Sequence, residues 1–124
     1  MKKLFIILLS FTVSAILYGC DTPRKDVSAE YAKELLIYNK DVIVLDVRTA
    51  AEFAAGHLPN AINIDVNDDS FKTKLQDLNK EGEYLVYCFV GIRSLKASKI
   101  MTETGFKKIY NLEDGIKNWS ESVQ

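Results

Sequence analysis

Cys88 is the residue whose type and surroundings most favour covalent chemistry. It ends the apolar run 84–88 (YLVYC) and is followed by Gly91, Arg93 and Ser94. A cysteine is a nucleophile only as the thiolate, and its free pKa of about 8.5 leaves little thiolate at neutral pH. Unpaired N–H groups at a helix start and a permanently charged guanidinium both favour that anion. This pattern predicts a nucleophile in a loop that also binds an anion.

Two other interpretations of Cys88 compete with this one. A free cysteine is often simply a buried core residue, and a strand can end in one without further reason. The chain also has a second cysteine, Cys20, and exported proteins usually pair their thiols. We favour the nucleophile because Gly91 lets the loop curl so that its N–H groups converge on one point.

The first 20 residues predict export and attachment to a membrane. Lysines 2 and 3 precede an apolar run over residues 4–17, which is typical of a secretory signal peptide and short for a membrane-spanning helix. The run continues into Leu17-Tyr18-Gly19-Cys20. This stretch resembles the lipobox of bacterial lipoproteins, although Tyr18 departs from the usual small or aliphatic residue. The resemblance implies cleavage before Cys20, lipid on that cysteine and a place in the bacterial cell envelope, facing the periplasm or the exterior. An ordinary secretory signal with a chance cysteine is the alternative.

Length and charge limit the remaining possibilities. The 124 residues are 48% hydrophobic and 27% charged, as expected for one globular domain. We expect a signal peptide over 1–19, a lipidated N-terminus and tether over 20–26 and the domain over 27–124. Residues 20–124 keep all 17 acidic side chains but lose Lys2 and Lys3 of the 16 basic ones, which leaves a net charge of −3. That charge excludes nucleic acid as a partner and predicts no polybasic surface for anionic lipids.

Strands and helices alternate along the domain. We expect strands over residues 42–47, 61–64, 84–88 and 108–112. Ser28 is a candidate N-cap, Thr49-Ala50-Ala51-Glu52 is a capping box, and Gly56 and Gly105 are candidate helix ends. Further helices are expected around 71–78 and 116–123. This alternation predicts an α/β fold with a parallel sheet covered on both faces. Ligands bind beyond the carboxyl ends of such strands, which is where Cys88 lies.

Residues 45–64 read LDVRTAAEFAAGHLPNAINI, residues 86–94 read VYCFVGIRS, and residues 105–119 read GFKKIYNLEDGIKNW. In this order, these stretches resemble the single-domain rhodanese sulfurtransferases over nearly all of residues 27–120. The resemblance implies a five-stranded parallel sheet with helices on both faces. It also implies an enzyme that moves sulfane sulfur from a small anionic donor, such as thiosulfate, to a thiol or cyanide acceptor. No cofactor and no metal are expected, and no protein partner is indicated.

By this resemblance Cys88 is the nucleophile and carries the sulfur as a persulfide. The loop that would bind the persulfide comprises Phe89, Val90, Gly91, Ile92, Arg93 and Ser94. Arg93 would either hold the loop or attract the donor. The six residues from Cys88 to Arg93 match the sulfurtransferases, whereas phosphatases and arsenate reductases of this fold use a loop one residue longer. Phe89 and Val90 replace polar residues of many relatives, which favours a larger or less charged donor than thiosulfate.

The other conspicuous polar residues have structural explanations. Asp46 and Arg48 follow a buried strand and are expected to fasten neighbouring loops. The capping box accounts for Glu52. His57 is the only histidine, and we expect it to hold the turn before Leu58-Pro59 rather than act as a base. Trp119 is expected in the core, and no residues show metal-ligand spacing.

Two functions outside sulfur transfer remain as alternatives. The first is a non-catalytic rhodanese-like module that recruits a protein, although such modules often lack the cysteine. The second is a thiol redox protein, which would need a resolving thiol that lipidation of Cys20 would remove.

Overall fold

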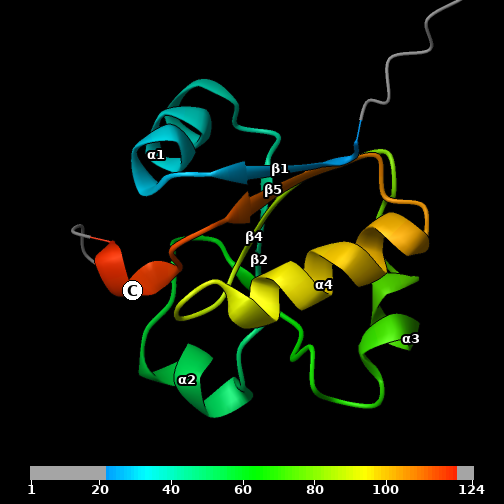
Figure 1. Cartoon of the computed structure of the whole chain (residues 1–124). Coiled ribbons are helices and arrows are strands. Elements are labelled where there is room, and N and C mark those ends of the chain that lie inside the picture. The colour runs from blue at the N-terminus through cyan, green and yellow to red at the C-terminus, as the bar shows by residue number, and fades with distance from the viewer. Residues whose placement is uncertain (1–21, 120–124) are drawn as a thin grey trace, which may run out of the picture.

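A computed structural model describes residues 22–119, in which five strands alternate with helices (Figure 1). The strands are β1 (Arg24–Val27), β2 (Ile43–Asp46), β3 (Ile62–Asn63), β4 (Glu83–Tyr87) and β5 (Lys108–Leu112). The helices are α1 (Ala29–Tyr38), α2 (Ala50–Ala55), α3 (Phe71–Leu75), α4 (Ile92–Glu103) and the 3-10 helix η1 (Ile116–Asn118). The expected signal peptide and Cys20 lie outside the described residues. No helix within residues 22–119 is long and apolar enough to cross a membrane.

The five strands form one parallel sheet in the order β1-β5-β4-β2-β3. Its two faces are covered by separate apolar layers, with α4 and α3 on one side and α1 on the other (Figure 1). Successive side chains of a strand point to opposite faces. In the central strand β4, Val86 therefore packs on the α4 side, while Leu85 and Tyr87 pack on the α1 side. Cys88, just after the strand, also packs on the α4 side. This confirms the expected parallel α/β architecture.

Local signals start the helices where the sequence predicts. The Ser28 hydroxyl accepts a hydrogen bond from the N–H of Tyr31 at 3.1 Å and caps α1. Thr49 and Glu52 form both halves of the capping box of α2, which ends at Gly56. These caps fix where the chain leaves β1 and β2, so they set the course of the segments around the carboxyl ends of the strands.

Three elements differ from the sequence-based expectation. Residues 24–26, expected in the tether, belong to edge strand β1, and the N–H of Ile109 donates to the carbonyl of Pro23 at 2.8 Å. Val27 is the only buried residue of β1, so the strand is stabilised mainly by backbone pairing with β5, which side-chain periodicity does not signal. Strand β3 has only two residues, and η1 stands where a longer helix was expected. Residues 120–123 of that predicted helix lie outside the described part.

Candidate active site

Cys88 is the first residue after the central strand, and its sulfur lies inside the loop that follows. The side chain is buried, with 1% of the residue exposed. Its Sγ accepts hydrogen bonds from the N–H of Gly91 at 3.1 Å and from the N–H of Ser94 at 3.3 Å. The Ser94 hydroxyl lies 3.5 Å from Sγ and donates to the Gly91 carbonyl at 3.1 Å. The loop thus directs donors at the sulfur from two sides.

These contacts decide the ionisation of the thiol. Burial is the largest influence on the Cys88 pKa and raises it. The Ser94 hydroxyl and the backbone N–H groups of Ser94, Gly91 and Val90 act in the opposite direction, and together they outweigh burial. The net result is a pKa below the ordinary value of a cysteine. The site therefore favours the thiolate despite excluding solvent.

Gly91 gives the loop its curled shape. It is the residue before α4 and has φ of 97°, in the region that favours glycine. A Cβ at Gly91 would lie 1.9 Å from the carbonyl oxygen of Glu113, so the loop packs directly on the chain after β5. The helix begins at Ile92, and the Ser94 N–H in its first turn donates to the sulfur.

A second glycine supports the loop from outside. Gly115 has φ of 70°, and a Cβ there would lie 2.2 Å from the carbonyl oxygen of Phe89. Next to it, the N–H of Ile116 donates to the Cys88 carbonyl at 2.9 Å, and that of Lys117 donates to the Phe89 carbonyl at 3.0 Å. The segment that leads into η1 thus fastens the start of the loop.

The loop presents an apolar rim to solvent. Phe89 and Val90 are 46% and 45% exposed, and Ile92 is 76% exposed. Large apolar side chains are usually buried, so this degree of exposure is unusual. The backbone groups of these three residues belong to the loop around Sγ, so the rim surrounds the place where a sulfur donor would approach.

Arg93 is bound to Glu52 by two hydrogen bonds. Arg93 Nη1 donates to Oε1 at 2.7 Å and Nη2 donates to Oε2 at 2.9 Å. The hydrogen bond from Arg93 is the largest influence on Glu52 and lowers its pKa to about 2. The capping box was expected to account for Glu52, and that explanation is incomplete, because the same carboxylate joins α2 to the first turn of α4.

Asp46 and Arg48 form a second, more deeply buried pair. Arg48 Nε donates to Asp46 Oδ1 at 3.0 Å, and Nη2 donates to Oδ2 at 2.7 Å and to the Gly56 carbonyl at 2.7 Å. The Tyr87 hydroxyl donates to Asp46 Oδ2 at 2.7 Å and accepts from the N–H of Leu58 at 3.0 Å. The pair fastens the segment after β2 to its neighbours, as the sequence predicts.

His57 and Trp119 have the contacts of structural residues. His57 Nδ1 lies 2.9 Å from the Phe53 carbonyl, and the two rings stack with centroids 3.8 Å apart. These contacts hold the turn after α2. Trp119 is partly buried against the α1 side of the core.

An open pocket of about 300 Å³ lies beside the loop. Its lining includes Phe89 from the rim, Glu52, Arg48 and Lys117. The charge of Arg48 is neutralised by Asp46, and the charge of Glu52 is neutralised by Arg93. Among the described residues, Lys117 is the cation of this lining that has no carboxylate within salt-bridge distance. Residues 22–119 contain no cluster of three or more His, Cys, Asp or Glu side chains arranged to hold a metal.

The comparisons with known proteins identify the family. The Rhodanese-like domain model matches residues 28–122, so the chain belongs to the rhodanese-like domain family. It is 34% identical over 95 residues to the putative sulfurtransferase YtwF of Bacillus subtilis, covering 77% of this chain and 89% of that protein. It is also 31% identical to a tRNA uridine(34) hydroxylase of Photorhabdus laumondii, but spans only 38% of that protein.

The solved structures give the same fold. A rhodanese-like domain protein from Staphylococcus aureus superposes with a TM-score of 0.72 at 32% identity, covering 81% of this chain and 96% of that one. That solved chain consists almost wholly of this domain. We expect residues 21–124 to fold alone, which cooperative urea unfolding of this fragment would check.

Proposed function

We propose that the protein is a sulfurtransferase that carries sulfane sulfur as a persulfide on Cys88. The observation that supports this most is the environment of the buried Sγ. It accepts hydrogen bonds from the N–H groups of Gly91 and Ser94 at the start of α4, in a rhodanese-like domain. Donors arranged in this way stabilise a sulfur anion and would equally hold the terminal sulfur of a persulfide.

The proposed reaction has two half-reactions that regenerate the thiolate. With thiosulfate as donor, the Cys88 thiolate attacks the outer sulfur, a sulfur–sulfur bond forms, and sulfite leaves with the electron pair of the broken bond. A thiolate or cyanide then attacks the terminal sulfur of the persulfide and removes it, and the electron pair of the sulfur–sulfur bond returns to Cys88. No base is required, because the nucleophile is already ionised.

We further propose that the physiological donor is larger or less charged than thiosulfate. Phe89, Val90 and Ile92 form an apolar rim, and Arg93, the cation of the loop, is held by Glu52. A dianionic donor gains little from a neutralised guanidinium. An alkyl persulfide should therefore load Cys88 with a higher second-order rate constant than thiosulfate does.

The test is the intact mass of residues 21–124 after incubation with thiosulfate or an alkyl persulfide, beside Cys88→Ser. Wild type should gain one sulfur, about 32 Da, and lose it when cyanide or a thiol is added. Cys88→Ser should gain none. If wild type takes up no sulfur from any thiosulfate, persulfide or polysulfide donor, the enzyme proposal fails.

Ser94→Ala tests the environment of the sulfur, with Ser98→Ala as its matched control. Both hydroxyls are buried on α4, but the Ser98 hydroxyl donates to the Ser94 carbonyl at 2.7 Å instead of facing Sγ. Ser94→Ala should raise the Cys88 pKa and slow sulfur uptake several-fold at neutral pH, whereas Ser98→Ala should leave both unchanged. The pH dependence of Cys88 alkylation measures this. Equal effects of the two substitutions would mean that the Ser94 hydroxyl has no special role at the thiol.

We also propose, from residues 1–20 alone, that the protein acts in the bacterial cell envelope and is anchored by lipid on Cys20. Expression of the full chain in bacteria with labelled palmitate should label the wild type but not Cys20→Ala. Label in neither protein would leave a secreted, unanchored enzyme.

A further inference from the structure

The described part of the chain begins at the amino ends of the parallel strands, whereas Cys88 lies at their carboxyl ends. Thr22 and Pro23 lead into edge strand β1, whose partner residues start at the amino end of β5. All strands are parallel, and Cys88 follows the carboxyl end of β4. A five-residue strand spans about 16 Å. Thr22 and Cys88 therefore lie at opposite ends of the parallel strands.

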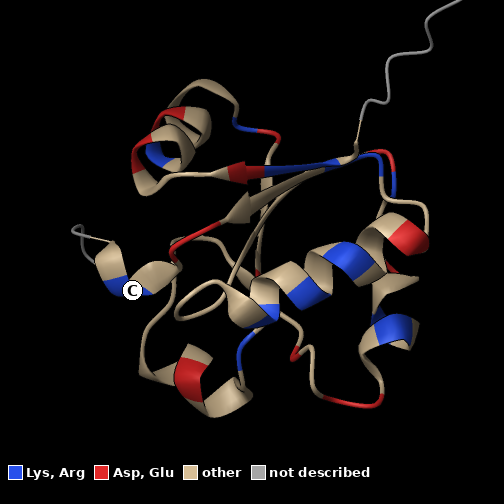
Figure 2. Ribbon diagram, in the orientation of Figure 1, with Lys and Arg blue, Asp and Glu red and all other residues tan. Residues whose placement is uncertain are grey.

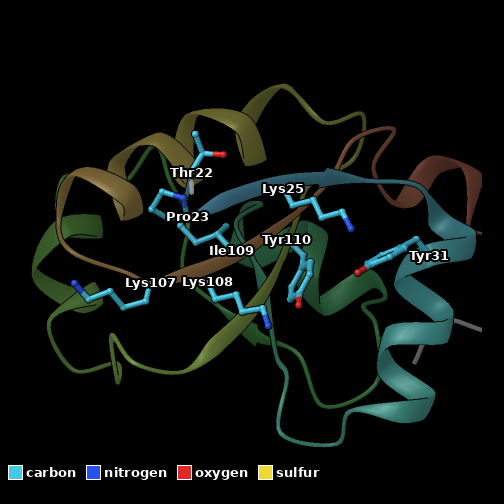
Figure 3. Close-up of a pocket in the computed structure, with 8 residues that line it drawn as sticks. All are labelled: Thr22, Pro23, Lys25, Tyr31, Lys107, Lys108, Ile109 and Tyr110. Carbon is cyan, nitrogen blue, oxygen red and sulfur yellow. The ribbon is translucent and has the colours of Figure 1, made fainter. Parts of the chain in front are cut away.

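Cationic side chains line two pockets beside Thr22 and Pro23, at the start of the described chain. A pocket of about 610 Å³ is lined by Thr22, Pro23, Lys25, Tyr31, Lys107, Lys108, Ile109 and Tyr110 (Figure 3). A second pocket, of about 300 Å³, shares Thr22 and Pro23 and is also lined by Arg24, Lys99, Thr102 and Glu103. We call the five cations of these two pockets the basic edge; they are Arg24, Lys25, Lys99, Lys107 and Lys108. Figure 2 shows basic residues at the start of β1 and along α4.

Several of these charges have no acidic partner. Arg24 pairs with Asp26 at 3.2 Å, and Lys108 pairs with Glu83 at 3.0 Å. Among the described residues, no carboxylate lies within 4.0 Å of the amino groups of the other three lysines of the basic edge. From a net charge of −3 for residues 20–124 we expected no polybasic surface for anionic lipids, and the positions of these five cations now motivate a different proposal for this edge. The fold brings five of the 14 basic side chains of residues 22–119 to this edge.

Tyr31, which is 38% exposed, adds amphipathic surface to the larger pocket, whereas Tyr110 beside it is buried. Lys25 Nζ lies 4.2 Å from the centroid of the Tyr31 ring, and the rings of Tyr31 and Tyr110 lie 6.1 Å apart. Figure 3 shows the Lys25 side chain extending towards the Tyr31 ring and Lys108 near Tyr110. Tyrosine is enriched at the headgroup level of membranes, where its ring is partly buried and its hydroxyl stays hydrated.

We propose that the basic edge docks on a membrane surface that contains anionic phospholipids, with Cys88 facing away from it. This extends the proposed lipid anchor. Cys20 is two residues from Thr22, a distance of at most about 7 Å along the chain. A lipid on Cys20 therefore holds the basic edge within about one Debye length, about 8 Å, of the headgroups, where lysines are attracted to anionic lipid.

The docked orientation leaves the reaction site open. The apolar rim around Cys88 and the pocket beside Lys117 lie at the carboxyl ends of the strands, on the side remote from Thr22. Donors and acceptors dissolved in the compartment would reach the sulfur without crossing the headgroup layer. The anchor would then set the direction in which the enzyme faces as well as its location.

The test uses residues 21–124, which lack Cys20 and therefore the lipid, in co-sedimentation with vesicles. One set contains three parts phosphatidylcholine to one part phosphatidylglycerol, and the other contains phosphatidylcholine alone. The domain should sediment with the anionic vesicles at low salt and be released at high salt. Lys25→Gln/Lys99→Gln/Lys107→Gln should weaken binding about five-fold per lysine and on the order of 100-fold in total.

A matched triple variant controls for total charge. Lys72→Gln/Lys74→Gln/Lys96→Gln removes the same charge from α3 and α4, at lysines that line neither pocket of the basic edge. It should weaken binding much less. Equal weakening by both triples, absence of binding by the wild type, or release by inorganic phosphate at constant ionic strength would overturn the inference.

Sulfur uptake, measured on the same samples, separates this inference from the proposed enzyme activity. Loading of Cys88 in solution should be the same in both triple variants. A domain that takes up sulfur but ignores anionic vesicles would overturn only the docking proposal. A domain that binds the vesicles but takes up no sulfur would overturn only the enzyme proposal.

Discussion

Asp46–Arg48 and Glu52–Arg93 are both two-pronged carboxylate–guanidinium pairs beside the loop of Cys88, but they join different parts of the chain. Asp46 and Arg48 are two residues apart, and their side chains are 0% and 8% exposed. Glu52 and Arg93 are 41 residues apart, and their side chains are 35% and 26% exposed. The same chemistry is therefore used once inside a single segment and once across the site.

The two pairs therefore hold different parts of the site in place. The Asp46–Arg48 pair is connected to Tyr87 and to the Gly56 carbonyl, so it holds the segment between β2 and β3 in place. The Glu52–Arg93 pair connects α2 to the helix whose Ser94 N–H donates to Sγ. We expect the first pair to matter mainly for stability and the second mainly for the position of the loop.

Asp46→Asn should produce the largest loss of stability. The substitution keeps the shape of the side chain but leaves the buried Arg48 charge without a counterion, which costs about 3–5 kcal/mol of unfolding free energy. Urea unfolding of residues 21–124 would show this as a lower midpoint with an unchanged slope. Sulfur uptake per folded molecule should change little.

Asp26→Asn is the matched control, because Asp26 pairs with Arg24 at 3.2 Å where both side chains are about a third exposed. Exposed pairs contribute little, so this substitution should cost at most about 1 kcal/mol. A cost for Asp46→Asn no greater than for Asp26→Asn would remove the distinction between a buried scaffold pair and an exposed one.

The two pairs also differ in how far the sequence could predict them. Asp46 and Arg48 are close in the chain after a predicted buried strand, and the capping box of Thr49 and Glu52 is a local spacing pattern. The contact between Glu52 and Arg93 depends on β4 lying next to β2, an arrangement that periodicity and capping do not specify. The sequence therefore predicted one partner of Glu52 and missed the other.

The same limit explains the rest of the site. The position of Cys88 at a strand end and the need for Gly91 in the loop followed from local patterns. The role of Gly115 did not, because it depends on the approach of the Phe89 carbonyl from a neighbouring strand end. The basic edge was missed because net charge averages over the whole surface, whereas the fold brings the two ends of the domain together in β1 and β5.

Substitutions in the Glu52–Arg93 pair should show whether Arg93 holds the loop or attracts the donor. If Arg93 positions the loop, Glu52→Gln and Arg93→Gln should slow sulfur uptake to a similar extent, roughly ten-fold, because the loop loses the same tie. The double variant should then be little worse than either single one, since residues of one contact are not additive. Single-turnover uptake of sulfur, followed by mass, measures all three.

Binding of the donor by Arg93 would give a different pattern. Glu52→Gln would release the guanidinium and speed the reaction with thiosulfate, while Arg93→Gln would slow it. An opposite response of the two single variants would therefore refute the positioning role.

The smallest expected effect is the contribution of the Glu52–Arg93 pair to the free energy of unfolding, which should decrease at acid pH. Arg93 lowers the pKa of Glu52 from 4.5 to about 2, so folding is stabilised where the carboxylate is ionised in both states. That stabilisation is fully present above pH 4.5 and is lost as the pH falls towards about 2. Because solvent screens the pair, the loss should amount to about 1 kcal/mol.

Glu52→Gln cannot ionise and should lack this part of the pH dependence. Urea midpoints of wild type and Glu52→Gln, measured at about pH 6 and about pH 3, should differ more at the higher pH and converge at the lower one. Parallel declines of the two proteins with acid would mean that the Glu52–Arg93 contact contributes no charge-dependent stability. The pair would then act on the loop through geometry alone, which sharpens its contrast with the buried pair of Asp46 and Arg48.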